Sequence, residues 1–390
     1  MLDLAEFDKL FGEGALRPAS TLKAREYRGS GSIALDVALG GGYGKGTVVD
    51  TIGKQSVGKT LAFEMAAVTA QRVENAPSVL FDFEGTFDPR RFKMLGGNPD
   101  RLALVRAENF GDKIEGMFLE WCTDMLKVML HKKMFACIGM DSTAAMTTYA
   151  EYKIKEEKGE EKQTVAYTAR GIASLLRLCI GSGLLQRSDS TLFFISQMRD
   201  NIGGRGFKGQ PPADKRTGGR ALPFFAATQL EISRGDLFKA DVQQESGYIE
   251  KDVEVGHETK VRVRKNKNNA KQGRVATFDL YSEGEVIGID RTEELAKLAV
   301  LTGVVEKIGT YYNIDGNRVA HGKDDLTSYL RSNSEIAAGV EIRTRQSLDV
   351  QQTAQALPSE VIYGVGDDFD PDDDIIGRLS AQEEAINAQT

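Results

Sequence analysis

Apolar, β-branched runs alternate with segments of helical periodicity along most of this 390-residue chain. The clearest predicted strands are 47–52, 78–83, 102–106, 134–140, 191–196 and 229–233, and helical patterns lie between them. This alternation predicts an α/β fold with a mostly parallel sheet, flanking helices and a ligand at the carboxyl ends of the strands. Two further strands, 261–265 and 274–281, are expected to extend the sheet in antiparallel directions.

The pattern changes at both ends of this α/β region. Apolar positions within residues 2–11 have the spacing of a short amphipathic helix, so 1–28 are expected to form an N-terminal helix and linker. We assign 29–286 to the core and 287–345 to a smaller α/β C-terminal domain with a Tyr-Tyr-Asn-Ile-Asp-Gly-Asn hairpin. Residues 346–390 are predicted to form an acidic, disordered tail.

The net charge of −7 is concentrated in that tail. Residues 359–390 hold nine acidic residues and one basic residue, a charge of −8, so residues 1–358 carry +1. The acidic balance is therefore no argument against nucleic-acid binding by the body of the chain. A tail of this kind could also compete with DNA for a basic surface.

Composition excludes several other classes of protein. No run of about 18 apolar residues is present, and the N-terminus lacks the basic and apolar stretches of a signal peptide, so we expect a cytoplasmic protein without a membrane span. Cys122, Cys137 and Cys179 sit apart in apolar patterns and fit reduced core residues. The three histidines (His131, His257 and His321) are too scattered for a metal cluster and are interpreted as structural.

A complete phosphate-binding loop of the form G-x-x-x-x-G-K-T lies between the first predicted strand and a predicted helix. It consists of Gly53, Lys54, Gln55, Ser56, Val57, Gly58, Lys59 and Thr60. Its glycines allow backbone N–H groups to surround phosphates, and the helix N-terminus adds a favourable dipole. We expect Lys59 to reach the β and γ phosphates and the Thr60 hydroxyl to hold Mg²⁺. The strand–loop–helix context argues against a chance glycine turn and predicts binding of a nucleoside triphosphate.

Three polar residues follow later strands and complete a predicted hydrolytic site. Asp141 ends an apolar strand, and we expect it to orient Mg²⁺ directly or through water. Glu84 lies just past a strand and is a candidate base for the attacking water, although an ordinary edge carboxylate is the alternative. Gln197 emerges from a buried strand and could contact the γ-phosphate.

Two basic segments suggest phosphate or nucleic-acid contacts. Residues 199–220 are rich in glycine, arginine and lysine and include Phe207, a composition that suits single-stranded nucleic acid as well as a disordered surface loop. Residues 260–274 hold seven basic residues and no acidic one. On a strand Lys265 and Lys267 share a face, so they either form a solvated surface or stabilise phosphate charge, as an arginine finger does.

Together these motifs resemble the bacterial RecA recombinase family over about residues 7–343. The collinear matches are 31–40, 53–60, 82–89, 140–142, 196–199, 217–222 and 265–267. The segments 217–222 and 265–267, with Tyr-Ser-Glu-Gly at 281–284, separate this family from other phosphate-loop ATPases. The resemblance implies a DNA-dependent ATPase that uses ATP and Mg²⁺, assembles as a helical filament on single-stranded DNA and exchanges strands with homologous duplex DNA. Single-strand-binding or loader proteins are further implied partners.

The resemblance also assigns roles to individual residues. It makes Glu84 the catalytic base, Gln197 the γ-phosphate sensor, and Lys265 and Lys267 the lysines that reach the ATP of an adjacent subunit. It places Asp88, Arg91 and Tyr281 at the adenine, and DNA-binding loops at about 151–171 and 199–220. The implied DNA-binding residues are Arg170, Arg177, Arg199, Arg205, Phe207, Lys208, Arg216, Gly218, Gly219 and Arg220.

Several positions depart from the family pattern and are compatible with a phage-encoded member. Arg91 replaces the tyrosine that stacks on adenine, so either its guanidinium or the ring of Phe92 is expected to cover the base. Pro223 replaces a lysine at the subunit interface, and Lys260 replaces an arginine implicated in repressor cleavage. The second DNA-binding loop is about four residues longer than usual, and the N-terminal helix is shorter.

Two other functions share part of this motif set. A hexameric helicase of the same fold would have the phosphate loop, Glu84 and Asp141, but not the segments 217–222 and 265–267. A filament mediator that binds ATP and hydrolyses it poorly is disfavoured because the phosphate-loop and carboxylate residues are intact. The order and spacing of the motifs favour the recombinase.

Overall fold

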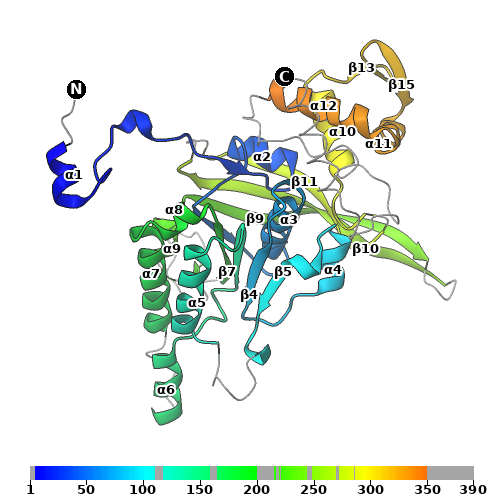
Figure 1. Ribbon diagram of the computed structural model, residues 1–390. Coiled ribbons are helices and arrows are strands. Elements are labelled where there is room, and N and C mark those ends of the chain that lie inside the picture. The colour runs from blue at the N-terminus through cyan, green and yellow to red at the C-terminus, as the bar shows by residue number, and fades with distance from the viewer. Residues whose placement is uncertain are drawn as a thin grey trace, which may run out of the picture.

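The computed structural model describes residues 5–109, 117–158, 165–199, 215–216, 219, 221–243, 248–268, 272–284 and 286–348. Its centre is a 10-stranded sheet with the strand order β12-β11-β10-β9-β3-β7-β6-β4-β5, in which β8 pairs with β7 (Figure 1). The parallel strands are β3 (Val48–Gly53), β4 (Ser78–Asp82), β5 (Leu102–Val105), β6 (Cys137–Asp141), β7 (Thr191–Arg199) and β9 (Thr228–Gln243). This arrangement confirms the predicted α/β fold class.

Helices cover both faces of the parallel strands, because side chains of a buried strand alternate between the two faces. On β7, Phe193 and Ile195 enter one core with α2, α3 and α4, whereas Leu192 and Phe194 enter the other with α5, α7 and α8. The helices of the first face are α2 (Ile33–Leu39), α3 (Lys59–Val73) and α4 (Pro89–Met94). Those of the second are α5 (Leu119–His131), α7 (Val165–Gly181) and α8 (Leu184–Ser188), with the short α9 (Ala221–Phe225) beside them.

The antiparallel half of the sheet is larger than predicted. It contains β10 (Ile249–Asn266), β11 (Val275–Tyr281) and β12 (Gly288–Ile289), and β9 and β10 pair along a hairpin of 16- and 18-residue strands. The predicted strands at 229–233 and 261–265 are therefore only the sheet-embedded ends of this hairpin. Its outer part projects from the body (Figure 1), where residues such as Leu237 and Ile249 are about half exposed. The apolar residues of this part are few and separated by charged ones, and the sequence pattern did not extend the predicted strands into it.

The predicted first DNA-binding loop is also mostly helical. The segment 151–171 falls on α6 (Tyr149–Lys158) and the first part of α7, and residues 159–164 lie outside the described residues. The prediction of a loop is thus wrong for 151–158 and 165–171. The sequence of α6 is rich in lysine and glutamate and has few apolar positions, so periodicity gave little indication of a helix.

The C-terminal domain forms a small α/β unit beside the sheet (Figure 1). It contains α10 (Arg291–Leu301), α11 (Lys323–Ser332), α12 (Ser334–Ser347) and an antiparallel sheet of β13 (Glu306–Ile308), β14 (Tyr311–Ile314) and β15 (Asn317–His321). Residues Tyr311 to Asn317 include the predicted hairpin. The predicted tail at 346–390 lies almost wholly outside the described residues.

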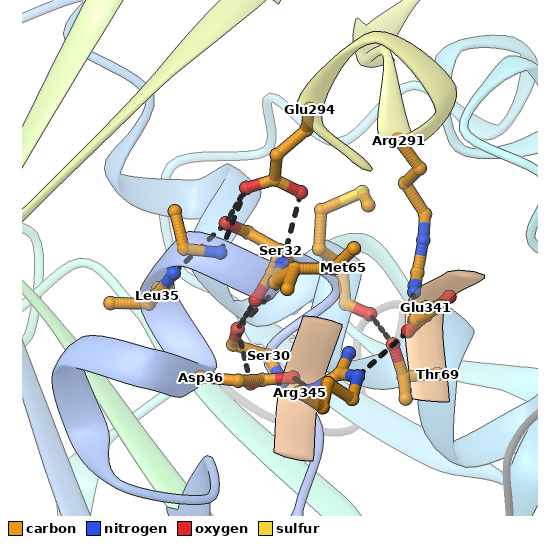
Figure 2. A network of polar contacts seen from close by, with 12 residues as sticks. Ser30, Ser32, Leu35, Asp36, Met65, Thr69, Arg291, Glu294, Glu341 and Arg345 are labelled. Carbon is orange, nitrogen blue, oxygen red and sulfur yellow. Dashed lines mark hydrogen bonds and ion pairs between the residues drawn. The ribbon is translucent and has the colours of Figure 1, made fainter. Parts of the chain in front are cut away.

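Buried polar contacts join this domain to α2 of the core (Figure 2). The fully buried carboxylate of Glu294 accepts hydrogen bonds from Ser32 Oγ at 2.5 Å and from the backbone N–H groups of Ile33 at 2.9 Å and Ala34 at 3.0 Å. Nearby, Arg345 of α12 forms an ion pair with Asp36 of α2 at 3.1 Å. A carboxylate at a helix N-terminus satisfies N–H groups that lack partners within the helix.

The chain before α2 is held against the core by a buried arginine. Arg28, in β1 (Tyr27–Arg28), pairs with Glu74 at 2.5 Å and donates to the carbonyl of Ala136 and the hydroxyl of Thr191, both at 2.7 Å.

The remaining elements are α1 (Ala5–Phe11), β2 (Tyr43–Gly44), β8 (Lys215–Arg216) and the 3₁₀ turns Ala19–Thr21 and Pro99–Arg101. Within the described segments, every helix is too short or too polar to cross a bilayer.

Candidate nucleotide-binding site

The phosphate loop connects β3 to α3 at the carboxyl edge of the parallel strands. Gly53 ends β3 so close to β9 that a Cβ atom there would lie 2.5 Å from the carbonyl oxygen of Ile232. Gly58 caps α3 with a φ of 88°, a left-handed conformation that glycine adopts without a steric penalty. Both glycines are therefore required by the shape of the loop, as its sequence predicted.

An open cavity of about 610 Å³ lies over this loop. Its floor includes Gln55, Ser56, Gly58, Lys59 and Thr60. Glu84, which follows β4, and residues of β6 and β7 line one end, and residues of α4, β9, β10 and β11 line the other. The observed strand order explains this convergence, because β3, β7, β6 and β4 are consecutive in the sheet and all end at the same edge.

The first end of the cavity holds the pair predicted for magnesium. The Thr60 hydroxyl donates to Asp141 Oδ2 at 2.7 Å, and the Lys59 ammonium donates to the carbonyl of Lys54. Burial, with the neighbouring charges of Glu84 and Asp82, raises the pKa of Asp141 to about 6. Burial also lowers the pKa of Lys59. A cation entering this pocket would relieve the unfavourable burial of the carboxylate charge.

The oxygen donors at this end fit Mg²⁺. A hydroxyl and a carboxylate oxygen are hard ligands, and Mg²⁺ commonly takes one or two protein ligands while waters and phosphate oxygens complete its octahedron. Among the described residues, no group of three or more His, Cys, Asp or Glu side chains is placed to hold a metal by itself. The pair Thr60 and Asp141 therefore suits a metal that is bound together with a nucleotide.

The candidate base Glu84 lies two residues beyond β4, in contact with side chains from two neighbouring strands. It accepts a hydrogen bond from Ser142, directly after β6, and one from Gln197 Nε2 of β7 at 2.9 Å. Glu84, Ser142 and Gln197 all line the cavity. The contribution of Ser142 was missed in the sequence, although it follows Asp141 directly.

The opposite end of the cavity is more apolar and contains Arg91, Met94, Leu95, Tyr281 and Ile287. Arg91 Nη2 forms an ion pair at 2.9 Å with Glu64, a residue of α3 whose side chain is 2% exposed. Because Arg91 has a buried carboxylate partner, its guanidinium is held at the wall. Glu64 was not predicted to take part in the site.

Two of the residues expected at the adenine lie elsewhere. Phe92 is fully buried and packs against Phe87 with ring centroids 5.7 Å apart, so the expectation that it could replace the stacking ring is wrong. Asp88 is not among the cavity-lining residues; it caps α4 by accepting from the backbone N–H of Arg90 at 2.8 Å.

Arg234 of β9 and His257 of β10 line the same end of the cavity and were both missed. Arg234 forms an ion pair with Glu254 and lies 3.2 Å from His257 Nδ1. His257, interpreted as structural from sequence, is 6% exposed, and burial lowers its pKa, as does the charge of Arg234. Both residues belong to the hairpin that the strand pattern did not reveal.

Lys265 lies in β10 and Lys267 directly after it, and both side chains reach the same carbonyl, that of Phe224. Neither lysine is among the residues that line the cavity. Lys265 Nζ donates to the carbonyls of Pro223 at 2.6 Å and Phe224 at 3.0 Å, and Lys267 Nζ donates to that of Phe224 at 3.4 Å. Burial and the charge of Lys267 lower the pKa of Lys265. The Phe224 ring is 72% exposed beside them.

The predicted DNA-binding residues are only partly described. Arg170 and Arg177 are exposed on α7. Arg199 ends β7, and the β7–β8 pairing joins Met198 to Arg216 and Arg199 to Lys215. Gly219 follows with a φ of 74°. Arg205, Phe207, Lys208, Gly218 and Arg220 lie outside the described residues.

Comparisons with known proteins cover nearly the whole chain. The family model described as the RecA N-terminal domain matches residues 1–286, and that described as the RecA C-terminal domain matches residues 293–349. Protein RecA of Xanthomonas axonopodis pv. citri (strain 306) is 33% identical over 371 residues, which span 94% of this chain and 96% of the relative. Protein RecA of Nocardioides sp. (strain ATCC BAA-499 / JS614) is 34% identical over 372 residues, with 93% and 96% covered. Protein RecA of Xylella fastidiosa (strain 9a5c) is 34% identical over 350 residues, with 89% and 91% covered.

Proposed function

The chain belongs to the RecA family, and on this basis we propose that it is a DNA-dependent ATPase that pairs and exchanges homologous DNA strands. Family membership supports a role in recombination and DNA repair. The observation that carries the proposed activity is the convergence of Lys59, Thr60, Glu84, Asp141 and Gln197 on one cavity. Because its substrate is DNA, we expect the protein to act in the cytoplasm.

The phosphate loop and its neighbours bind the triphosphate. Backbone N–H groups around Gly58 and the N-terminus of α3 face the phosphates, and the Lys59 ammonium exchanges the Lys54 carbonyl for phosphate oxygens. Thr60 and Asp141 would hold Mg²⁺, which neutralises charge on the phosphate oxygens when it is bound. Arg91 and Tyr281 face the base and ribose at the other end.

Hydrolysis is assigned to Glu84, with Gln197 and Ser142 as its positioning partners. A carboxylate just past a strand end can orient a water molecule toward the γ-phosphate and accept its proton. When no phosphate is near, the hydrogen bond from Gln197 occupies an oxygen of the Glu84 carboxylate. When Gln197 turns to the γ-phosphate, Glu84 is released to accept a proton from water.

Self-association into a filament completes the proposed site. Lys265 and Lys267 would reach the ATP of a neighbouring subunit, where added positive charge stabilises the transition state. Their present contacts with the carbonyls of α9, beside the exposed Phe224, place them at the surface. Helix α1 lies apart from the body (Figure 1), with Leu10 70% and Phe11 69% exposed, and an adjacent subunit would cover this apolar surface.

Single-stranded DNA is assigned to the basic segments that border the site. The segment 200–214 begins three residues after Gln197 and ends at β8, which pairs with β7, so DNA contacts in this segment are linked to the γ-phosphate end of the cavity. Arg170 and Arg177 of α7 add exposed positive charge. Homologous duplex DNA and single-strand-binding or loader proteins are further proposed partners.

The test is ATP hydrolysis by the purified protein with Mg²⁺, with and without single-stranded DNA. We expect DNA to stimulate hydrolysis and Lys59→Ala to abolish both hydrolysis and nucleotide binding. Normal nucleotide affinity in Lys59→Ala would contradict the site assignment. A rate of ATP hydrolysis that single-stranded DNA does not change would contradict the proposed activity.

A further inference from the structure

Tyr281 links the nucleotide cavity to the C-terminal domain. It ends β11 and lines the cavity, while its hydroxyl donates a hydrogen bond at 3.0 Å to Glu293 Oε2 in the first turn of α10. Phe238 of the long hairpin packs against Tyr281, with ring centroids 5.8 Å apart. The ring in the cavity is therefore held by two elements outside the phosphate loop.

Glu293 is itself fixed by two ammonium groups of the C-terminal domain. Lys323 Nζ of α11 lies 2.5 Å from Glu293 Oε1, and Lys297 Nζ of α10 lies 3.2 Å from it. Burial alone would raise the pKa of Glu293, but these two lysines and the Tyr281 hydroxyl outweigh it and hold the pKa below its usual value. Burial raises the pKa of the Tyr281 phenol, as does the carboxylate of Glu293, so the phenol remains a donor. The acceptor is thus an ionised carboxylate in a defined position.

The helix that carries Glu293 is also hydrogen-bonded to the core. Its next residue, Glu294, is the buried carboxylate that accepts three hydrogen bonds at the N-terminus of α2 (Figure 2). Asp290 caps the same helix by accepting from the N–H groups of Thr292 and Glu293, both at 3.0 Å. Adjacent carboxylates therefore have separate tasks: Glu294 docks the domain, and Glu293 contacts the cavity wall.

We propose that the C-terminal domain sets the position of Tyr281 through Glu293 and Lys323, and thereby the affinity of the cavity for its nucleotide. The proposal rests on the proposed function in that it takes the cavity to be the nucleotide site. Tyr281 is the residue that touches the ligand, and Glu293 is a positioning residue. Any partner or DNA contact that moves α10 or α11 would change nucleotide affinity in the same step, without touching the phosphate loop.

The experiment measures the dissociation constant of a fluorescent ATP analogue with Mg²⁺ for the full-length protein. The variants are Glu293→Ala, Glu293→Gln, Tyr281→Phe and the double variant Tyr281→Phe/Glu293→Ala. Asp324→Ala is the control, because Asp324 is an exposed acidic residue in the first turn of α11, next to Lys323. The thermal unfolding midpoint of each nucleotide-free variant is measured alongside, so that a loss of stability is separated from a loss of affinity.

We expect Glu293→Ala and Tyr281→Phe each to weaken binding about three- to tenfold, the effect of one hydrogen bond of ordinary net strength. The affinity of the double variant should be no lower than that of whichever single variant binds the nucleotide less tightly, because both changes remove the same contact. Glu293→Gln should recover most of the affinity, since its amide oxygen still accepts from Tyr281, and Asp324→Ala should match the wild type.

Unchanged affinity in Glu293→Ala, in a protein whose binding is abolished by Lys59→Ala, would overturn this inference and leave the proposed function standing. Additive losses in the double variant would overturn it as well, because the two residues would then act independently. Wild-type affinity in Lys59→Ala would overturn the proposed function and the inference together.

Discussion

Gln197 Nε2 donates a hydrogen bond of 2.9 Å to Glu84, which joins the end of β7, just before the basic segment 200–214, to the candidate catalytic carboxylate. The two residues come from β7 and from the end of β4, on either side of β6 in the sheet. Because β7 is also paired with β8 on the far side of that segment, the proposed DNA contacts would adjoin the strand that carries Gln197, the hydrogen-bond donor to Glu84. This relationship gives a physical route by which DNA can control hydrolysis.

Glu84→Gln should separate binding from hydrolysis. Glutamine retains the shape of the side chain and can still contact Gln197, but it cannot accept a proton from water. We expect nucleotide affinity to stay near that of the wild type and the rate of DNA-dependent hydrolysis to fall about 10²–10⁴-fold. Glu283→Gln, an exposed carboxylate beyond β11, is the matched control. A turnover rate in Glu84→Gln close to that of the wild type would assign the base to another residue.

Gln197→Ala should uncouple hydrolysis from DNA. Removing the amide breaks the contact between β7 and Glu84, so binding of DNA at the adjacent segment no longer changes the state of the carboxylate. We expect the stimulation of hydrolysis by single-stranded DNA to drop about tenfold or more, from the loss of a hydrogen bond to a charged group. The ratio of rates with and without DNA is the measurement. Stimulation equal to that of the wild type would show that the link runs through other residues.

The ion pair of Arg28 and Glu74 should make stability depend on pH. Burial alone would raise the pKa of Glu74, but Arg28 and Lys45 outweigh it and lower the pKa from its usual value of 4.5. Because the pKa of Glu74 is lower in the folded than in the unfolded protein, its charge stabilises the fold when the pH is above the unfolded-state pKa. This stabilisation is lost as the pH falls through the folded-state pKa. Glu74→Gln should therefore cost about 1–3 kcal/mol at neutral pH, with Arg28 left buried and poorly paired.

The measurement is the free energy of unfolding of the wild type and Glu74→Gln between pH 7 and pH 3. We expect the difference between them to shrink as the pH falls below about 4.5. The control is Glu26→Gln, since the Glu26 side chain is 75% exposed where it pairs with Lys45. A difference that stays constant over this range would show that the charge of Glu74 does not contribute.

Lys265→Ala tests whether a neighbouring subunit completes the site. A charge supplied in trans is worth about 10³–10⁵ in rate in GTPases, so we expect DNA-dependent hydrolysis to fall about 10³-fold or more. Mixing Lys265→Ala with Lys59→Ala should restore activity, because the second variant can donate Lys265 to the intact nucleotide site of the first. Arg262→Ala, an exposed basic residue on the same strand, should remain active alone. A mixture as inactive as its two components would contradict the role in trans.

The part of the site built on parallel strands could be predicted from the sequence. Buried strands leave continuous apolar runs, so β3, β4, β6 and β7 were found together with the polar residues at their ends. Topology then required Thr60, Glu84, Asp141 and Gln197 to meet at one edge. Their contacts in the structure follow from that order of strands.

The opposite end of the cavity could not be predicted in the same way. Arg234 and His257 lie just outside the strands predicted at 229–233 and 261–265, and no motif in the sequence assigned either of them to the cavity. Glu64 lies within an ordinary helical pattern, and its pairing with Arg91 depends on the packing of α4 against α3. The hydrogen bond between Tyr281 and Glu293 joins two domains. Periodicity within a single strand or helix does not predict which residues of two domains meet.

The most direct test of the central claim is homology-dependent joining of a single-stranded oligonucleotide to a supercoiled plasmid by the purified protein with Mg²⁺ and ATP. We expect joint molecules with a homologous oligonucleotide and none with a heterologous one, and loss of product in Lys59→Ala. Absence of joint molecules, under conditions where the protein hydrolyses ATP on single-stranded DNA, would contradict strand exchange and favour an ATP-driven helicase.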